Sequence, residues 1–219
     1  MVKLLGAGRT TVGPDVVYSA VRGGRELFAS TIGVGPDRAR ESTRRLIGAL
    51  DVEHVVVSGV AGAIHPETEV GTVVVPDVVI DLETEREFSP HPLGGTCPDG
   101  KRGPLVSSGR LVTADHEVRG LVERGVVAID MESAAVAEVC QASATPWSAI
   151  RCVSDRPRDG MIDDSVFQLL DEDGNADVRA ALRFVLSHPR RVPDLARLAR
   201  DSTTAARRAA RSTLLACEG

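Results

Sequence analysis

Hydrophobic residues gather into seven short runs, which are separated by stretches rich in glycine, proline and charged residues. Several runs are almost continuously apolar, which is typical of strands buried on both faces of a sheet. Their length and their content of β-branched residues predict β-strands. The predicted strands span residues 16–21, 26–31, 54–60, 72–79, 105–108, 126–130 and 147–153.

Between several of these runs, apolar residues recur at the spacing of an amphipathic helix. This spacing predicts helices over 36–50, 114–124 and 132–142, and a helical region over 176–215 that is broken near Pro189 and Pro193. Alternating strands and helices predict an α/β fold in which helices cover a central sheet. The length of 219 residues favours one domain over 1–219, with 176–219 as a helical C-terminal extension.

Composition and charge exclude several classes of protein. A hydrophobic share of 42% and a charged share of 26% are ordinary for a globular protein, and the 3% of aromatic residues leaves the core to aliphatic side chains. The net charge of -5 argues against bulk attraction to nucleic acid or to an anionic membrane. No run approaches ~18 apolar residues and the first ten residues lack a signal-peptide pattern, so we expect a soluble, cytoplasmic protein.

The cysteines and histidines show no metal-binding or catalytic spacing. The four cysteines form no CxxC pair, and the five histidines are scattered without a Ser/His/Asp arrangement. We therefore expect no metal ion and no cofactor, and reduced cysteines that suit a reducing cytoplasm.

Small residues follow two of the predicted strands, at the place where ligands of open α/β sheets bind. One is Ser-Gly-Val-Ala-Gly-Ala-Ile at 58–64, and the other is Gly-Val-Gly-Pro-Asp at 33–37, which opens a helix whose free N–H groups could cradle a phosphate or a ribose hydroxyl. Neither matches the dinucleotide or P-loop fingerprint. A tight turn without a ligand explains the same residues.

Carboxylates end two later strands. Asp130 and Glu132 lie in Asp-Met-Glu-Ser-Ala-Ala-Val-Ala-Glu-Val-Cys, and Asp155 ends Arg-Cys-Val-Ser-Asp. We expect the three carboxylates to converge on one sheet edge. Cleavage of a glycosidic bond to a purine passes through a cationic, oxocarbenium-like sugar, so it needs an acid for the base and an acceptor for sugar hydroxyls. One carboxyl group can serve each role.

These two segments resemble the paired signatures of the nucleosidase and phosphorylase superfamily, which includes the methylthioadenosine/S-adenosylhomocysteine nucleosidases. The segment at 58–64 and Val-Gly-Thr-Val-Val-Val-Pro at 70–76 resemble its other two landmarks, in the right order. The similarity spans residues 26–155. It implies a three-layer α/β fold with a central mixed β-sheet flanked by helices, assembled as a homo-oligomer, with a dimer favoured.

The resemblance also implies residue roles. Asp155 would protonate or hydrogen-bond the purine at N7 with support from Ser154, Glu132 would hold ribose hydroxyls, and Met131 would pack on the sugar. The other implied substrate-binding residues are Val60, Ala61, Gly62 and Val112. The structural alternatives are a turn cap for Asp155, an arginine partner for Glu132 and a core position for Met131, and we interpret Asp130 as structural.

The chain departs from the family at the attacking group. Nucleosidases of this type carry an acidic residue after the first strand, yet no Asp or Glu lies between Met1 and Gly13. Phosphorylases collect Arg and Ser around phosphate, but Val57 and Val60 stand where these would be expected. Either the chain starts late and lacks the first strand with its acid, or residues 2–5 are that strand and the chemistry has changed.

The sequence therefore favours hydrolytic release of the base from a purine nucleoside or 5'-substituted adenosine. Phosphorolysis, with phosphate as co-substrate, and a catalytically silent nucleoside-binding protein are the alternatives. The run at 175–182 and the arginine-rich tail resemble hopanoid-associated members of the family. Membrane contact through this basic C-terminal helix is thus a less favoured reading than a small soluble nucleoside.

Overall fold

The computed structural model of the chain describes residues 8–93, 100–156 and 192–218. A three-stranded antiparallel sheet comes first, in the order β1-β2-β3. Its strands are β1 (Gly8–Val12), β2 (Asp15–Arg22) and β3 (Arg25–Ser30). The predicted strands 16–21 and 26–31 are thus confirmed. β1 was not predicted, because four of its five residues are exposed and give no apolar run.

A seven-stranded sheet forms the centre of the molecule, in the order β5-β10-β4-β9-β8-β6-β7. β10 runs parallel to β4, and β8 runs parallel to both β6 and β9, whereas the other three pairings are antiparallel. The predicted mixed sheet is confirmed. The strands are β4 (Val55–Ala63), β5 (Val73–Val74), β6 (Val78–Asp81), β7 (Glu87–Phe88), β8 (Pro104–Ser107), β9 (Ala128–Asp130) and β10 (Trp147–Asp155).

The prediction of one strand over 72–79 was wrong. The segment forms two strands, β5 beside β10 and β6 beside β8, with Pro76 between them. Proline has no N–H to donate to a neighbouring strand, so it interrupts an otherwise continuous apolar run. The chain thereby crosses from one edge of the sheet to the far side.

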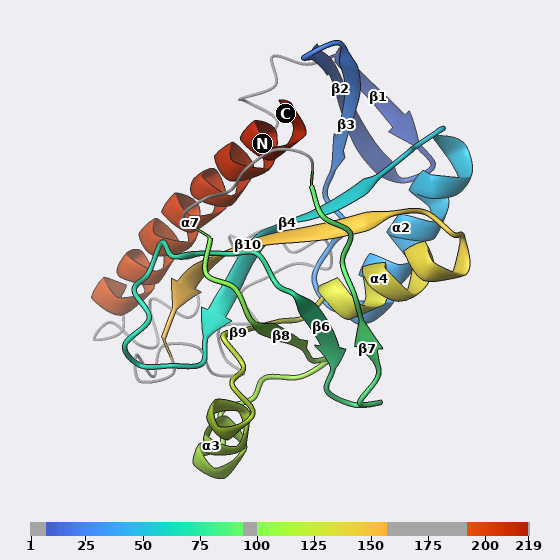
Figure 1. Cartoon of the computed structure of the whole chain (residues 1–219). Coiled ribbons are helices and arrows are strands. Elements are labelled where there is room, and N and C mark those ends of the chain that lie inside the picture. The colour runs from blue at the N-terminus through green and yellow to red at the C-terminus, as the bar shows by residue number, and fades with distance from the viewer. Residues whose placement is uncertain (1–7, 94–99, 157–191, 219) are drawn as a thin grey trace.

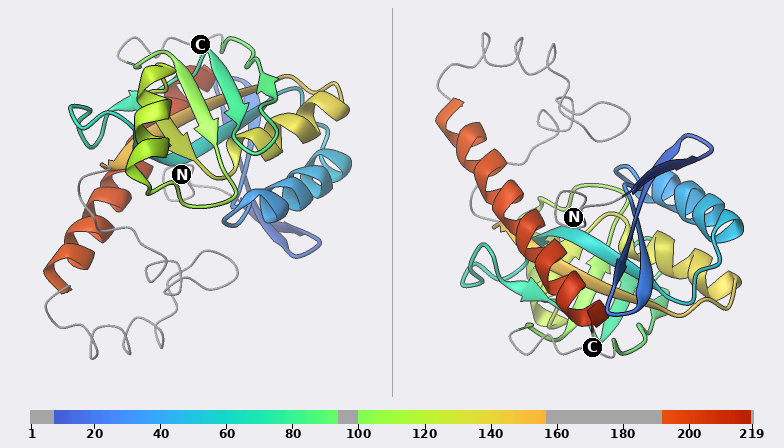
Figure 2. Two further views of the ribbon diagram at one scale, coloured as in Figure 1. Left: turned by 90° about the horizontal axis from the view of Figure 1, so that it is seen from below. Right: turned by 90° about the horizontal axis from the view of Figure 1, so that it is seen from above.

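Helices cover both faces of the central sheet (Figures 1 and 2). α7 (Val192–Glu218) packs along β10 and β4 on one face, and α2 (Pro36–Ala49) and α4 (Ser133–Ala142) stack together on the other. α3 (Asp115–Glu123) lies between β8 and β9 in sequence. Three predicted helices and the predicted three layers are confirmed. Pro193 lies in the first turn of α7, where a proline is tolerated.

Several sequence predictions lie outside the described residues. They are a strand at 2–5, the helical region from 176 to 191 with its break at Pro189, and one of the four cysteines, Cys97. Among the described residues, no helix is long and apolar enough to cross a membrane.

Alternate residues of β4 separate the two layers of core, as expected for a strand. Val57 and Ala61 belong to the large aliphatic core on the α4 side, whereas Val60 packs with Cys152 beneath α7. The small residue Ala205 allows α7 to approach this cluster closely. β4 and β10 therefore pack against apolar side chains on both faces of the sheet.

Candidate active site

The strand register relates the three predicted carboxylates to one another. Asp155 at the end of β10 pairs with Gly62 of β4, and Gly62 pairs in turn with Ile129 of β9. Asp130 directly follows Ile129, and Glu132 lies two residues further on. Because β10 runs parallel to β4 and β9 runs antiparallel to it, the ends of β9 and β10 point in opposite directions along β4, and the meeting of all three carboxylates at one sheet edge stays a prediction.

Asp155 is oriented by its neighbour Ser154. The hydroxyl of Ser154 donates to Oδ1 of Asp155 at 2.6 Å, and it lies 3.4 Å from the carbonyl oxygen of Ala61. A Cβ atom on Gly62 would lie 3.2 Å from Oδ2 of Asp155 and 3.4 Å from Cγ2 of Ile129. The absence of a side chain at Gly62 thus gives the carboxyl group its room.

A buried arginine joins the other two carboxylates. Arg151 points from β10 toward α4, and its side chain is only 6% exposed. Its Nη2 lies 2.5 Å from Oδ2 of Asp130 and 3.5 Å from Oε2 of Glu132. Its Nε donates to the Ser133 hydroxyl at 3.2 Å, and that hydroxyl donates to Oδ2 of Asp130 at 2.5 Å. Asp130 thus serves a structural role, as interpreted from the sequence.

Glu132 links this cluster to the start of α2. Its Oε1 accepts the backbone N–H of Gly35 at 3.0 Å, and its side chain is 15% exposed. Burial raises the pKa of Glu132, and the charge of Asp130 adds to this, whereas Arg151 acts in the opposite direction. Glu132 therefore binds one of the backbone N–H groups that the sequence had offered to a ligand at the turn 33–37.

The arginine occupies space that only a glycine leaves. A Cβ atom on Gly59 of β4 would lie 2.5 Å from Nη1 of Arg151, well inside contact distance. The segment Ser-Gly-Val-Ala-Gly-Ala-Ile therefore needs both of its glycines, Gly59 for Arg151 and Gly62 for Asp155. Two glycines that the sequence assigned to a ligand or to a turn make room for charged side chains.

The remaining predicted residues lie in different surroundings. Val112 and Ile129 both pack against one buried aliphatic cluster, and Ile129 borders Asp155 across Gly62. Met131 lines a small hollow beside Pro36 and Gly109. Ala61 is buried and offers its carbonyl oxygen to Ser154. The side chain of Val60 is apart from these, because it packs with Cys152 under α7.

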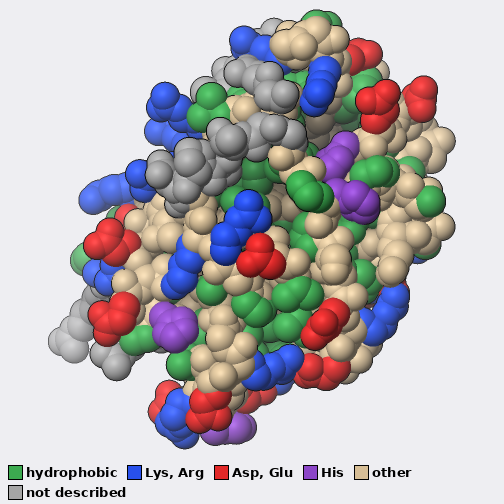
Figure 3. Space-filling view, in the orientation of Figure 1, with side chains coloured by type: hydrophobic (Ala, Val, Ile, Leu, Met, Phe, Trp, Pro, Cys, Tyr) green, Lys and Arg blue, Asp and Glu red, His purple; other side chains and the backbone are tan. Residues whose placement is uncertain are grey.

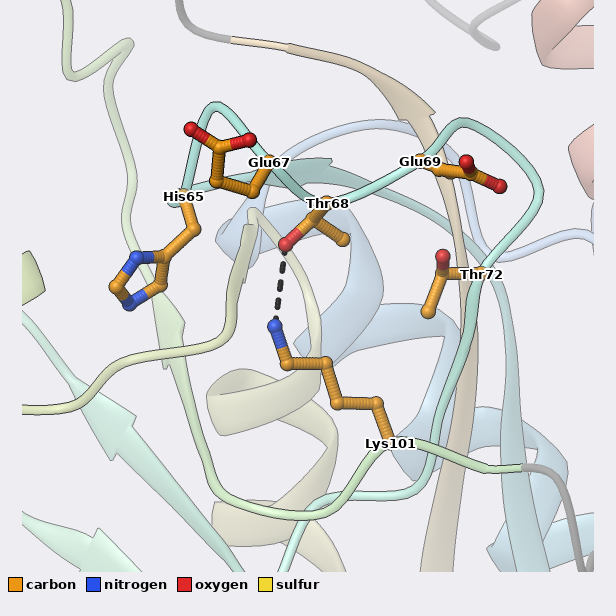
Figure 4. A pocket seen from close by; sticks show the side chains of 6 residues that line it. All are labelled: His65, Glu67, Thr68, Glu69, Thr72 and Lys101. Atoms are coloured by element: carbon orange, nitrogen blue, oxygen red, sulfur yellow. Dashed lines mark hydrogen bonds between the residues drawn. The ribbon is translucent and has the colours of Figure 1, made fainter.

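A larger hollow of about 550 Å³ is distinct from the candidate site. Its lining residues are His65, Glu67, Thr68, Glu69, Thr72 and Lys101, shown in Figure 4. Lys101 donates to the Thr68 hydroxyl at 3.1 Å, and both glutamates are exposed. None of the predicted site residues lines this hollow, and we place the chemistry at the strand ends instead.

Sequence reasoning missed Arg151 and Ser133 as members of the site, whereas Gly35 belongs to the turn at 33–37 that the sequence had singled out. The signal for Arg151 was present, since a charged residue inside the apolar run 147–153 has to find a partner when it is buried. Within the described residues, no group of three His, Cys, Asp or Glu side chains could hold a metal ion.

Comparisons with known proteins point to one family. A family model described as the phosphorylase superfamily matches residues 7–102 and 97–187. The 5'-methylthioadenosine/S-adenosylhomocysteine nucleosidase of Marinomonas is 28% identical over 160 residues, which are 60% of this chain and 69% of that protein. An aminodeoxyfutalosine nucleosidase of Helicobacter pylori is 24% identical over 170 residues, 66% of this chain and 74% of that protein.

A solved structure shows the same fold. The 5'-methylthioadenosine/S-adenosylhomocysteine nucleosidase of Neisseria meningitidis, in complex with methylthio-immucillin-A, superimposes with a TM-score of 0.72. The match has 19% sequence identity and covers 99% of this chain and 94% of that chain. Together with the family match over most of the sequence, this shows that the chain belongs to the phosphorylase superfamily.

Proposed function

We propose that the chain hydrolyses the N-glycosidic bond of a purine nucleoside, with Asp155 as the acid and Glu132 as the sugar acceptor. The observation that carries the proposal is that one strand, β10, holds both Asp155, which accepts the Ser154 hydroxyl, and Arg151, which pairs with Glu132. Two carboxyl groups of different surroundings thus flank one site. This is the arrangement that separate acid and acceptor roles require.

The chemistry follows from the two environments. Asp155 gives its proton to N7 of the purine as the bond from C1' to the base breaks, and its contact with Ser154 fixes the direction of transfer. The sugar becomes cationic and takes up the oxygen of water at C1', and the proton that the water releases passes to solvent. Glu132 accepts the sugar hydroxyls, and because its side chain is only 15% exposed, these hydrogen bonds are stronger than they would be in water.

The charge balance favours water over phosphate as the attacking group. Arg151 is buried against two carboxylates, so it offers no uncompensated positive charge to a dianion. Arg40, which lines the small hollow beside Met131, is paired with Asp37 and Glu138. The positive charges of Arg151 and Arg40 are therefore already compensated by carboxylates, which favours water over phosphate.

We further propose a 5'-substituted adenosine as the substrate. The support is the naming of the relatives, which are methylthioadenosine/S-adenosylhomocysteine and aminodeoxyfutalosine nucleosidases. Among the residues of the site, Val112 and Ile129 offer an aliphatic wall beside Asp155 that suits a flat purine ring.

Base release, followed by chromatography with and without phosphate, tests both proposals. Methylthioadenosine, S-adenosylhomocysteine, adenosine and inosine form the panel. We expect adenine from at least one adenosine derivative in phosphate-free buffer, and loss of release in Asp155→Asn. Asp77→Asn is the matched control, because Asp77 is an exposed aspartate paired with Arg102 away from the site. Release that requires phosphate would overturn hydrolysis, and nucleoside binding without release would favour a silent binding protein.

We also propose a homodimer in the cytoplasm, as the resemblance implies. Light scattering should then give about twice the chain mass of 23.2 kDa. Figure 3 shows Lys and Arg side chains spread among acidic and apolar ones on the face that it draws. In α7, Arg200, Arg207 and Arg211 are exposed, while Ala205 and Ala209 pack with Cys152 of the sheet. This division suits a packed helix with a solvated face. Sedimentation with anionic vesicles would test membrane contact, which we do not favour.

A further inference from the structure

We infer that Glu83 is a positioning residue that holds the loop carrying Val112 against the candidate site, and so sets how tightly the site binds the base. The inference rests on the proposed function, because it assigns the base to the wall formed by Val112 and Ile129. Glu83 lies in the turn between β6 and β7, beside the end of β8 (Figure 1).

One carboxylate oxygen of Glu83 fixes the start of this loop. Its Oε1 accepts the Ser108 hydroxyl at 2.9 Å and the backbone N–H of Gly109 at 3.1 Å. The Ser108 hydroxyl oxygen accepts the backbone N–H of Arg110 at 3.2 Å. Three successive residues after β8 are thus tied, directly or through Ser108, to a single atom.

Glu83 is itself held in place from β6. Oδ1 of Asp81 accepts the backbone N–H of Glu83 at 2.9 Å and that of Thr84 at 3.0 Å, and the N–H of Leu82 donates to Ser107 at 2.9 Å. No ion pair of Glu83 occurs within the described residues. Its carboxylate therefore serves the loop and not a surface salt bridge.

The tied loop lies against two other parts of the site. A Cβ atom on Gly109 would lie 3.4 Å from Cγ of Pro36, the first residue of α2, and Gly109 and Met131 line the same small hollow. The N–H of Ser108 donates to the carbonyl of Asp130 at 2.9 Å. Further along, Val112 packs against the same aliphatic cluster as Ile129. A loop released at Ser108 and Gly109 would thus loosen the wall of the base site.

Base release by three variants, with hydrogen exchange of the peptide 105–112, tests the inference. Glu83→Ala removes both acceptor bonds, Glu83→Gln keeps an amide oxygen that can accept them, and Glu85→Ala is the control. Glu85 belongs to the same turn but pairs with Arg124 instead of the loop. We expect Glu83→Ala to raise KM roughly three- to tenfold, as for the loss of one or two hydrogen bonds, with kcat within about twofold.

The expected pattern also includes faster exchange of 105–112 in Glu83→Ala, and values near wild type in Glu83→Gln and Glu85→Ala. Unchanged exchange in Glu83→Ala would overturn the inference, as would faster exchange with unchanged KM, since Glu83 would then be only structural. If the wild type releases no base, the proposed function fails by itself. Calorimetry of adenine binding then replaces KM, with a weaker affinity expected in Glu83→Ala and an unchanged affinity overturning the inference.

Discussion

The contact between Gly59 and Arg151 makes Gly59→Ala the sharpest perturbation of the site. The added methyl carbon would lie 2.5 Å from Nη1, about 1 Å inside a normal contact. Arg151 cannot retreat freely, because its other nitrogens contact Ser133 and Asp130 and its side chain is 6% exposed. Overpacking of this kind costs about 1–3 kcal/mol. For a chain of this size, 2 kcal/mol lowers Tm by roughly 4–8 °C.

Activity should fall further than stability predicts. A guanidinium displaced by about 1 Å carries Glu132 with it, and a misplacement of this size can cost about a hundredfold in rate. The assay is kcat/KM for base release beside urea unfolding of the same preparation. Gly48→Ala is the control, since nothing lies within 4 Å of its Cβ position in α2. The reasoning is refuted if Gly59→Ala unfolds and turns over like Gly48→Ala.

Three further predictions concern ionisable groups. Burial raises the pKa of Glu132 above 4.5, so its ionisation makes the folded state less stable as pH rises from about 4.5, and Glu132→Gln should show a smaller fall in urea titrations at successive pH values. Burial alone would raise the pKa of Asp15, but bonds from Arg45 and Ser42 outweigh it and lower the pKa below 3.8. The stability that ionised Asp15 adds is present above 3.8 and lost as pH falls through the lower folded pKa, so Asp15→Asn should cost about 1–2 kcal/mol at neutral pH and less in acid. Burial raises the pKa of Cys140 to about 12 and of Cys152 to about 11, so mass spectrometry should find both thiols unlabelled by a disulfide reagent until urea is added.

The sequence predicted the features that follow from apolar runs, namely the central strands and the carboxylates at their ends. The apolar residues of β4 and β10 made most of both strands readable, although the predicted ends at 60 and 153 fall short of the observed ends at 63 and 155. Asp155 ends β10 and Glu132 follows β9, so both stand where an apolar run stops. The Pro76 interruption was readable too, but the apolar residues on both sides of it masked the break.

The rest of the site depends on contacts between residues far apart in the chain. Arg151 and Glu132 are 19 positions apart, and Gly35 reaches Glu132 across 97 positions. Glu83 stands in a turn with Glu85, and Glu87 follows at the start of β7. Nothing in the sequence separates the glutamate that binds the loop from the other two. The apolar pattern of a sequence predicts that a strand is buried, but it does not predict which residue pairs with a buried charge.

The burial of Glu132 connects the stability of the cluster to the proposed chemistry. Asp130 and Glu132 together outweigh the single charge of Arg151, so an ionised Glu132 is under-compensated in the free protein, and its pKa is raised mainly by burial. A sugar that turns cationic supplies the missing positive charge at the moment of bond cleavage. Because the surroundings are poorly solvated, that attraction is stronger than it would be in water. In the proposed reaction, ionised Glu132 is therefore stabilised more in the transition state, where the sugar is cationic, than in the free protein.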